Sequence, residues 1–359
     1  MARPNQARLD LGALRHNVSV VRQLAPQSRI VAVVKANAYG HGAVTIASAL
    51  RTQVDALAVA CIEEAIELRS AGIDTPILLL QGVFEAAELV IAARMSLWLT
   101  IENEQQLRWL EDAYLQTPVT CWLKVDTGMN RLGVVPKRAA EFYQRLRASD
   151  NVHDEVVTCT HFAAAEDVKS SQTQRQLKIF ESLSFGAQRS ACNSAGILAW
   201  PGAHFDWVRP GYMLYGNSPM PGEHPSAQGL RPVMTLTSAV ISLRDVAIGE
   251  AVGYGGTWVA QRPSRIATVT IGYGDGYPRG AANGTPVLVN GQRAALAGRV
   301  SMDMITVDVT DLANIEIGAQ VVLWGAGLPL AEVAHCANTI GYELTTRMPA
   351  RTPRTVISD

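Results

Sequence analysis

The chain has 359 residues, of which 48% are hydrophobic and 18% are charged, and its formal net charge at pH 7 is −1. This composition is typical of a globular protein with an ample core and suggests about two domains. The near-zero charge argues against nucleic acid or an anionic membrane surface as the main partner. No segment approaches the roughly 20 apolar residues of a membrane span, and the first residues lack a signal-peptide core, so we expect a cytoplasmic protein.

The five cysteines, Cys61, Cys121, Cys159, Cys192 and Cys336, lie mostly in apolar segments, and none belongs to a CxxC pair. We therefore interpret them as reduced core residues. The histidines are scattered without metal-ligand spacing, so no metal site is expected.

Short apolar segments alternate with segments of helical period over the first two thirds of the chain. Strands are predicted at 29–34, 56–60, 76–80, 96–100, 119–125, 155–162, 189–193 and 205–208, and helices at 61–72, 101–115 and 136–149. This alternation predicts a parallel sheet of βα units. Eight strands are the number that closes a TIM-like (β/α)8 barrel, and an open doubly wound sheet is the alternative.

From about residue 230 the pattern becomes β-rich, with Gly, Asn, Asp and Pro turns between the strands. Such segments occur at 233–246, 264–278, 285–300, 302–312 and 319–327. A hairpin is predicted at Asn290-Gly291, and an amphipathic helix only near the end, at 329–340. We therefore expect a barrel domain over 1–230 and a mostly antiparallel β domain over 231–359, joined through the Gly/Pro/Ser-rich segment 216–232.

The segment RIVAVVKANAYGHG, residues 29–42, delivers a lysine at the end of a buried strand. Lys35 either caps the strand and extends its ammonium to water, or it supplies a reactive amine. His161, Ser194 and Arg209 also follow predicted strands, and Arg131 lies a few residues behind one. Because chemistry in a barrel gathers at the carboxyl ends of the strands, these residues are predicted to form one layer.

Each residue of this layer also has an ordinary structural interpretation, and only the whole set indicates a cofactor. In NSAGIL, residues 193–198, Ser194 precedes a short helix, where it either binds a phosphate with the backbone amides or only caps the helix. Single arginines such as Arg131 are most often surface residues. A lysine amine, a phosphate site and two arginines in one cleft nevertheless suggest pyridoxal 5′-phosphate held as a Schiff base.

Six segments, in order along essentially the whole chain, resemble the motifs of bacterial alanine racemases: AVVKANAYGHG, LKVDTGMNRLG, HFDWVRPG, VGYGGTW, IGYGDGYPR and GRVSMDM. The resemblance implies a pyridoxal-phosphate-dependent isomerase with a barrel, a C-terminal β domain and a homodimer with shared active sites. It also implies interconversion of L-alanine and D-alanine, which supplies D-alanine for peptidoglycan or feeds alanine catabolism.

The resemblance implies two catalytic bases acting on the cofactor-bound substrate, Lys35 for D-alanine and Tyr254 for L-alanine on the opposite face. Arg209 would pair with the pyridine nitrogen. Arg131 would contact the cofactor's phenolic oxygen and the substrate carboxylate, which the backbone of Met302 would also hold.

Further roles follow from the same resemblance. The phosphate would be surrounded by Tyr39, Ser194, Gly211 and Tyr342, and His161 would complete the cofactor-binding set. Tyr273 would line the entrance, and Asp303 and Lys124 would support the site. Lys124 matches a lysine that is carbamylated in some members, and Tyr212 stands where an aliphatic residue is expected.

Racemisation itself favours two bases, because a single base on one face mostly returns the proton that it removed. A free tyrosine titrates at about pH 10, so Tyr254 would need positive charge nearby, for which His161 and Arg209 are the candidates. Arginine keeps its proton, so Arg209 would leave the pyridine nitrogen unprotonated. The resulting weaker electron sink favours racemisation over transamination.

Other readings remain open from the residues alone. Tyr254 among glycines is consistent with an aromatic residue in a β-bulge, and GYGDGYPR with a hairpin corner. A pyridoxal-phosphate carrier protein would resemble the first domain alone, so the β domain counts against it. An amino-acid decarboxylase shares the two-domain plan but has an acidic residue where Arg209 stands here.

Overall fold

A computed structural model describes residues 3–358, in two compact units. The barrel unit comprises Arg15–Ala38 and Ala43–Leu230. The β unit comprises the N-terminal residues up to Leu14, the segment Tyr39–Gly42, and the chain from Arg231 onward. Across the described residues, no helix is both long enough and apolar enough to span a membrane.

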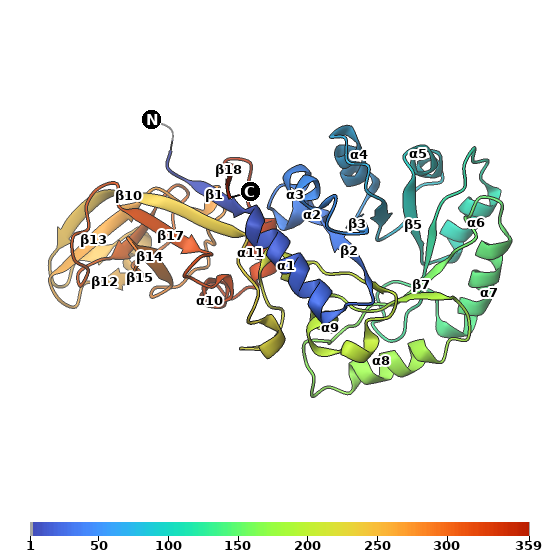
Figure 1. Ribbon diagram of the computed structural model, residues 1–359. Coiled ribbons are helices and arrows are strands. Elements are labelled where there is room, and N and C mark those ends of the chain that lie inside the picture. Colours follow the sequence, from blue (N-terminus) through green and yellow to red (C-terminus); the bar gives the residue numbers. More distant parts are fainter. Residues whose placement is uncertain (1–2, 359) are drawn as a thin grey trace. The chain divides into compact units, whose positions relative to one another are not determined.

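Eight parallel strands close into a barrel in sequence order (Figure 1). The strands are β2 (Arg29–Val33), β3 (Ala56–Val59), β4 (Ile77–Leu79), β5 (Leu97–Ile101), β6 (Cys121–Lys124), β7 (Val157–Cys159), β8 (Gln188–Ser190) and β9 (Trp207–Val208). The helices along this part of the chain are α1 (Leu11–Leu24), α2 (Lys35–Tyr39), α3 (Ala43–Leu50), α4 (Ile62–Ser70), α5 (Glu88–Arg94), α6 (Glu104–Asp112), α7 (Pro136–Ala148), α8 (Gln172–Glu181) and α9 (Ser194–Ala199). Short 3-10 turns follow at η1 (Pro201–Ala203), η2 (Tyr212–Tyr215) and η3 (Pro225–Ala227). The predicted barrel is confirmed, and the open doubly wound sheet is excluded.

Three indoles meet inside the barrel. Trp98 on β5, Trp122 on β6 and Trp207 on β9 have ring centroids 5.6 to 6.4 Å apart. Because β9 pairs with β2 and β8 rather than with β5 or β6, these side chains can meet only across the interior. Side chains alternate along a strand, so Lys124, two residues after Trp122, points the same way. The three indoles therefore fill the barrel interior just below the polar residues at the carboxyl ends of the strands.

The β unit contains an eight-stranded sheet in the order β13-β16-β15-β14-β17-β10-β1-β18. An additional pairing of β10 with β13 closes the strands from β13 to β10 into a β-barrel, and β1 and β18 extend the sheet beyond β10. The strands along this part of the chain are β1 (Gln6–Asp10), β10 (Met234–Val246), β11 (Ala251–Val252), β12 (Trp258–Val259), β13 (Ser264–Val269), β14 (Pro286–Val289), β15 (Gln292–Leu296), β16 (Ile305–Asp308), β17 (Gln320–Trp324) and β18 (Arg354–Ser358). The 3-10 turns η4 (Tyr254–Gly256) and η5 (Tyr273–Asp275) and the helices α10 (Leu330–Cys336) and α11 (Gly341–Thr346) complete it. The prediction of a mostly antiparallel β domain is confirmed.

The predicted hairpin at Asn290-Gly291 joins β14 to β15. Both turn residues have positive φ, 47° for Asn290 and 77° for Gly291, which is the requirement of a two-residue type I′ turn. The Asn290 side chain also accepts a hydrogen bond of 3.1 Å from the N–H of Gln320 on β17. The turn therefore fixes the register of the hairpin and ties it to the next strand.

The N-terminal strand β1 belongs to the β unit, which corrects the assignment of all of residues 1–230 to the barrel domain. It pairs antiparallel with β10 and parallel with β18. Ala7 and Leu9 are fully buried, whereas Gln6, Arg8 and Asp10 are only partly buried. This alternation fits a half-buried strand of an antiparallel sheet and not the strands of the barrel, which are buried on both faces.

We predict that Gly40→Ala destabilises the protein far more than Gly284→Ala. Both glycines have left-handed φ, 81° and 89°, which costs alanine about 1–2 kcal/mol at either site. Only at Gly40 would the new Cβ collide, 1.8 Å from the carbonyl oxygen of Thr345, since nothing lies within 4 Å at Gly284. Urea unfolding should therefore show a loss of about 1 kcal/mol for Gly284→Ala and about 3 kcal/mol or more for Gly40→Ala. Equal losses would contradict the close contact.

Candidate active site

Polar side chains gather at the carboxyl edge of the barrel strands. Lys35 follows β2, Lys124 ends β6, His161 follows β7 and Arg209 follows β9. The charges of Arg209, Lys124, Arg131 and Lys35 all act on His161, so these five residues lie close together. The structure thus brings four of the residues predicted to form one layer, Lys35, Arg131, His161 and Arg209, to one edge of the barrel.

The amine of Lys35 lies in surroundings that disfavour its charged form. Burial lowers the pKa of Lys35, the charges of Arg131 and Lys124 lower it further, and Glu64 opposes them. A lowered pKa leaves a larger fraction of neutral amine at pH 7, and only the neutral amine is a nucleophile or a base. These surroundings favour a reactive amine over a strand cap whose ammonium extends into water.

Directly after Lys35, the segment labelled α2 is a left-handed turn and not a right-handed helix. Residues 36–39 have φ of 52–53°, which costs non-glycine residues about 1–2 kcal/mol each. The carboxylate of Glu64 on α4 holds the start of the turn, with Oε1 accepting from the N–H of Ala36 at 2.7 Å and Oε2 from the N–H of Ala60 at 2.8 Å. Glu64 was not among the predicted site residues, because an acidic residue in an amphipathic helix gives no sign of the backbone that it reaches.

Arg209 is a buried cation held by neutral acceptors. Its Nη2 donates to the carbonyl oxygens of Thr160 at 2.6 Å and Ala191 at 3.3 Å, and its Nη1 donates to the hydroxyl of Ser190. Burial lowers the pKa of Arg209, yet a guanidinium keeps its proton. Within residues 3–358, no carboxylate pairs with Arg209 and its Nε donates no hydrogen bond. The Nε–H therefore remains for an acceptor such as a ring nitrogen.

His161 is neutral, so the prediction that it supplies positive charge is wrong. Burial lowers the pKa of His161 well below its usual value, and the charges of Arg209, Lys124 and Arg131 add to this. Nη2 of Arg209 lies 3.4 Å from Nδ1 of His161. Nε2 of the ring lies 3.4 Å from Nδ2 of Asn193. Both neighbours can only donate, and a neutral ring accepts at one nitrogen only, so just one of the two contacts is a hydrogen bond. Of the two candidates, only Arg209 is left as a cation.

Ser194 organises the loop after β9. Its Oγ accepts hydrogen bonds from the N–H groups of Gly211 at 3.0 Å and Met213 at 3.3 Å. It does not cap α9, because Asn193 does so by accepting from the N–H of Gly196 at 3.0 Å. The interpretation of Ser194 as a helix cap is therefore wrong, and its hydroxyl proton can be donated to an acceptor such as a phosphate oxygen.

Three buried or partly buried tyrosines belong to the predicted phosphate end. Burial raises the pKa of Tyr39 to about 12, and its ring lies 6.1 Å from that of Tyr342, tilted by 44°. Tyr212, the residue unexpected from the resemblance, is buried in η2, and burial raises its pKa too. The hydroxyls of Tyr39 and Tyr212 are thus neutral at pH 7 and can act as donors.

Arg131 is presented by a tight loop at the end of β6. The N–H of Val134 donates to the carbonyl of Lys124 and the N–H of Asp126 to the carbonyl of Val134, both at 2.9 Å. The carboxylate of Asp126 accepts from the N–H groups of residues 128–130 at 2.9 to 3.1 Å. Arg131 is exposed, and its guanidinium makes no hydrogen bond or ion pair with the part of the chain described. It is therefore open to an anionic ligand.

Tyr254 belongs to the β unit and lies on the 3-10 turn η4, between β11 and β12. Gly253 and Gly255 beside it have φ of 75° and 73°. The guanidinium of Arg299 lies against Gly255, where an added Cβ would be 3.5 Å from its Cζ. The β-bulge interpretation is wrong, since a glycine-flanked turn holds Tyr254 with its side chain 73% exposed in the chain.

Tyr273 and Met302 lie on two loops of the β unit that are bonded to each other. The N–H of Tyr273 donates to the carbonyl of Ser301 at 3.0 Å, and the N–H of Gly274 donates to the carbonyl of Met302 at 2.9 Å. The N–H of Met302 donates to none of the described residues. That donor is available to a carboxylate, as the resemblance implies.

Asp275 anchors these loops and was not predicted from the sequence. Its buried carboxylate pairs with Arg3 at 2.8 Å and Arg351 at 3.0 Å and accepts the N–H of Gly272 at 3.0 Å. Arg351 also pairs with Asp303. The GYGDGYPR segment therefore forms the 3-10 turn η5 rather than a hairpin corner.

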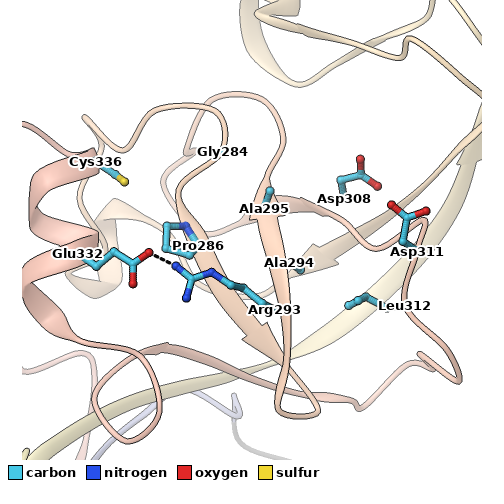
Figure 2. A pocket seen from close by; sticks show the side chains of 10 residues that line it. All are labelled: Gly284, Pro286, Arg293, Ala294, Ala295, Asp308, Asp311, Leu312, Glu332 and Cys336. Atoms are coloured by element: carbon cyan, nitrogen blue, oxygen red, sulfur yellow. Dashed lines mark ion pairs between the residues drawn. The ribbon is translucent and has the colours of Figure 1, made fainter.

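A pocket of about 450 Å³ in the β unit contains none of the predicted site residues. Figure 2 shows the ion pair between Arg293 and Glu332, two of the residues that line it, with Asp308 and Cys336 among the other lining side chains. All five cysteines are free thiols. Within residues 3–358, no group of three or more His, Cys, Asp or Glu side chains is arranged to hold a metal ion.

A lysine amine of lowered pKa, a buried arginine with an open donor and a serine beside two backbone amides at the mouth of a barrel are typical of pyridoxal-phosphate enzymes. The comparisons with known proteins agree with this class. Two family models match, "Alanine racemase, N-terminal domain" over residues 9–219 and "Alanine racemase, C-terminal domain" over residues 233–356. The chain therefore belongs to the alanine racemase family, whose members are pyridoxal-phosphate-dependent isomerases.

Similar proteins cover almost the whole chain. The biosynthetic alanine racemase of Escherichia coli O6:H1 is 51% identical over 342 residues, which is 94% of this chain and 95% of that protein. The alanine racemase of Chromohalobacter salexigens is 50% identical over 99% of this chain and 98% of that protein. The crystal structure of the biosynthetic alanine racemase from Pseudomonas aeruginosa has a TM-score of 0.95 at 48% identity and covers 99% of this chain and 100% of that one.

The neutral state of His161 predicts a specific dependence of stability on pH. The unfolded chain binds a proton at this residue below about pH 6.5, and the folded chain does so only at lower pH. Its contribution to the free energy of unfolding is thus complete above pH 6.5 and is lost as the pH falls toward the folded pKa. Between pH 7.5 and 5.5, His161→Asn should lose about 1 kcal/mol less than the wild type in urea unfolding.

The exposed residue His153 provides the matched control for this measurement. His153→Asn should follow the wild-type pH dependence, because the side chain of His153 is exposed to solvent and does not lie at the barrel edge. An unchanged pH dependence in His161→Asn would show that His161 is not held neutral in the folded protein.

Proposed function

We propose that the chain interconverts L-alanine and D-alanine in the cytoplasm through two bases on opposite faces of the substrate, Lys35 and Tyr254. The observation that carries the proposal is the surroundings of Lys35, where burial and neighbouring cations lower the pKa of an amine at the barrel edge. The word "biosynthetic" in the names of the Escherichia coli and Pseudomonas aeruginosa proteins supports a role in supplying D-alanine.

The residues at the barrel edge fit pyridoxal 5′-phosphate. Lys35 offers an amine for the aldehyde carbon, and Nε of Arg209 offers a donor to the pyridine nitrogen. Ser194, with Gly211 beside it, offers a hydroxyl and a loop to the phosphate, and Tyr39 offers a neutral hydroxyl. When bound, the cofactor supplies an electron sink for the pair of electrons left when a proton leaves Cα.

Proton transfer then depends on the two bases. Lys35 takes the proton from, or returns it to, Cα of D-alanine, and its lowered pKa keeps the neutral form accessible. Tyr254 does the same on the opposite face for L-alanine. Arg209 keeps its own proton, so it would leave the pyridine nitrogen of a bound cofactor unprotonated and make that ring a weaker electron sink, which favours racemisation over transamination.

The substrate carboxylate would be held by two open donors. The guanidinium of Arg131 makes no hydrogen bond or ion pair with the described chain, and a guanidinium binds a carboxylate with paired donors. The N–H of Met302 is likewise not donated to the described residues. The bulk of Met302 and Tyr342 next to the substrate favours alanine over larger amino acids.

We further propose a homodimer in which the β unit of one chain supplies Tyr254 to the barrel edge of the other. Tyr254, Tyr273 and Met302 are 73%, 39% and 52% exposed in the single chain. These three side chains have proposed roles in the active site, and a second chain packed over them would remove them from solvent. In a C2 dimer each chain covers these residues of the other. A carrier protein would not need these residues, and a decarboxylase would not place an arginine at position 209.

The cofactor linkage predicts one labelled lysine. After loading with pyridoxal 5′-phosphate and reduction with borohydride, peptide mapping should find the pyridoxyl group on Lys35. Lys124→Arg should keep the label there, and Lys35→Arg should lose both the label and the racemase activity. A label on Lys124 or any other lysine of the wild type would refute the assignment.

The shared site predicts complementation between two inactive variants. Lys35→Ala and Tyr254→Phe chains, mixed equally and allowed to reassort, should form about half mixed dimers by random pairing. One site of each mixed dimer then has both an intact Lys35 and an intact Tyr254, so about a quarter of the wild-type activity should return.

Mass spectrometry of the intact dimers shows whether reassortment has occurred. Tyr114→Phe, a change at an exposed tyrosine of the barrel unit, should keep full activity and controls for the loss of a tyrosine hydroxyl. Activity no greater than the sum of the separate variants, with mixed dimers present, would mean that both bases come from the same chain.

A further inference from the structure

The N–H of Met302, which is proposed to hold the substrate carboxylate, has a direction that neighbouring hydrogen bonds fix. A trans peptide group is planar, so its C=O and N–H point in opposite directions. The carbonyl of Ser301 belongs to the same peptide group as this N–H, and it accepts from the N–H of Tyr273 at 3.0 Å. The N–H of Met302 therefore points away from Tyr273 and is held in that direction by η5.

The next two carbonyls of the Met302 loop are held as well. The carbonyl of Met302 accepts from the N–H of Gly274 on η5 at 2.9 Å. The carbonyl of Asp303 accepts from Nη2 of Arg3 at 3.3 Å, a contact across 300 positions of the chain. Three successive carbonyls, those of residues 301–303, are thus bonded from outside the loop.

The two loops touch along their backbones. An added Cβ at Gly272 would lie 2.3 Å from the carbonyl oxygen of Ser301, and one at Gly274 would lie 3.1 Å from the carbonyl oxygen of Met302. Glycine permits this close approach because it has no Cβ. A displacement of η5 would therefore be passed directly to the peptide group that carries the Met302 N–H.

The place of η5 depends in turn on the carboxylate of Asp275, whose side chain is 1% exposed. Nη1 of Arg3 donates to Oδ1 at 2.8 Å and Nη2 of Arg3 donates to Oδ2 at 3.0 Å, which is a bidentate pair. Nε of Arg351 lies 3.0 Å from Oδ1. Because a buried carboxylate is unfavourable without such partners, the two arginines stabilise the turn in this position.

The two arginines reach Asp275 from neighbouring chain segments. Arg3 precedes β1 and Arg351 precedes β18, and these strands pair in parallel with Ala7 opposite Arg354. Arg351 also pairs with the side chain of Asp303, whereas Arg3 bonds to its backbone. Arg3 therefore links the anchor of η5 to the backbone of the Met302 loop.

We propose that Arg3 is a positioning residue for the substrate carboxylate: it joins Asp275 to the backbone of Asp303 and so fixes the direction of the Met302 N–H. The inference rests on the proposed role of Met302 in binding that carboxylate. Without Arg3, η5 and the Met302 loop lose their common attachment, and the N–H no longer has one direction.

Kinetics of L-alanine racemisation by the pyridoxal-phosphate-loaded protein test this role. Arg3→Met should raise the KM for L-alanine about 3- to 10-fold, the effect of one weakened hydrogen bond. The kcat should stay within about twofold, because the carboxylate is bound alike before and during proton transfer. Arg3→Lys should recover only part of the KM, because an ammonium keeps the charge without the paired donors.

Arg262→Met is the matched control. Arg262 pairs with Asp311 on the surface of the same unit, and their side chains are 54% and 74% exposed. This variant also removes an arginine–aspartate pair, but at neither of the two loops, so its KM and kcat should equal those of the wild type. The Arg3 side chain is itself 38% exposed, so Arg3→Met should fold, and its urea midpoint checks this.

Hydrogen exchange measured by mass spectrometry reports on the loops themselves. In Arg3→Met, peptides covering residues 270–277 and 300–305 should exchange about 3- to 10-fold faster than in the wild type, because the hydrogen bonds between the loops open more often. Peptides from β14 and β15 and the urea midpoint should match the wild type. A merely structural role would instead lower the urea midpoint and speed exchange across the sheet, with the KM unchanged.

The outcomes separate this inference from the proposed function. A wild type that does not racemise alanine would refute the proposed function before any variant is compared. Faster exchange in both peptides with an unchanged KM would show that Arg3 fixes the loop but that Met302 does not bind the substrate, which refutes the proposed role of Met302. A raised KM with unchanged exchange would mean that Arg3 acts through its charge and not through the loop. That result, no change in either quantity, or equal effects in the control would overturn the positioning role.

Discussion

A lysine acts as a base near neutral pH only when its ammonium form is disfavoured, and the barrel edge is built around this constraint. Burial and the charges of Arg131 and Lys124 lower the pKa of Lys35. The same field, with Arg209 added, keeps His161 neutral. A group of cations cannot be buried without some compensation. Glu64 opposes the neighbouring cations at Lys35, and Oε2 of Glu102 lies 3.7 Å from Nζ of Lys124. The chemistry proposed for Lys35 therefore depends on how few negative charges the site contains and where they lie.

The second requirement is that this amine stays in one place. The left-handed turn after Lys35 is unfavourable for the non-glycine residues that form it. It persists because Glu64 accepts the N–H of Ala36 and Asn37 accepts the N–H of Ala43 at 2.7 Å. Backbone strain held by surrounding hydrogen bonds is a recurrent feature of functional sites. Glu64 thus contributes both to the geometry of Lys35 and to its charge balance.

The sequence predicted the eight barrel strands because strands buried on both faces appear as uninterrupted apolar segments. It did not place β1 in the β unit, because a five-residue alternating segment does not reveal which sheet it joins. Glu64 and Glu102 were missed for a related reason, since their contacts depend on where helices and strands meet in space. The prediction that His161 is positively charged was wrong, because burial and neighbouring cations decide the protonation of a histidine and a sequence motif contains neither. Asn193, and not the adjacent Ser194, caps α9, and only coordinates distinguish two such neighbours.

Racemisation requires bases on both sides of the substrate, and one barrel edge alone does not readily supply them. Two bases must approach one carbon from opposite sides, and a ring of strand ends presents its side chains from one side. In the proposed arrangement the barrel unit supplies Lys35, and the second base comes from a unit with its own core. The β unit suits this role because η4 is held between two short strands and lies against Arg299. The loops that carry Tyr273 and Met302 are fixed by Asp275. A base on a turn anchored in this way is positioned by contacts within the β unit alone. The surroundings of Tyr254 can therefore change without altering the surroundings of Lys35 in the barrel unit, and the reverse.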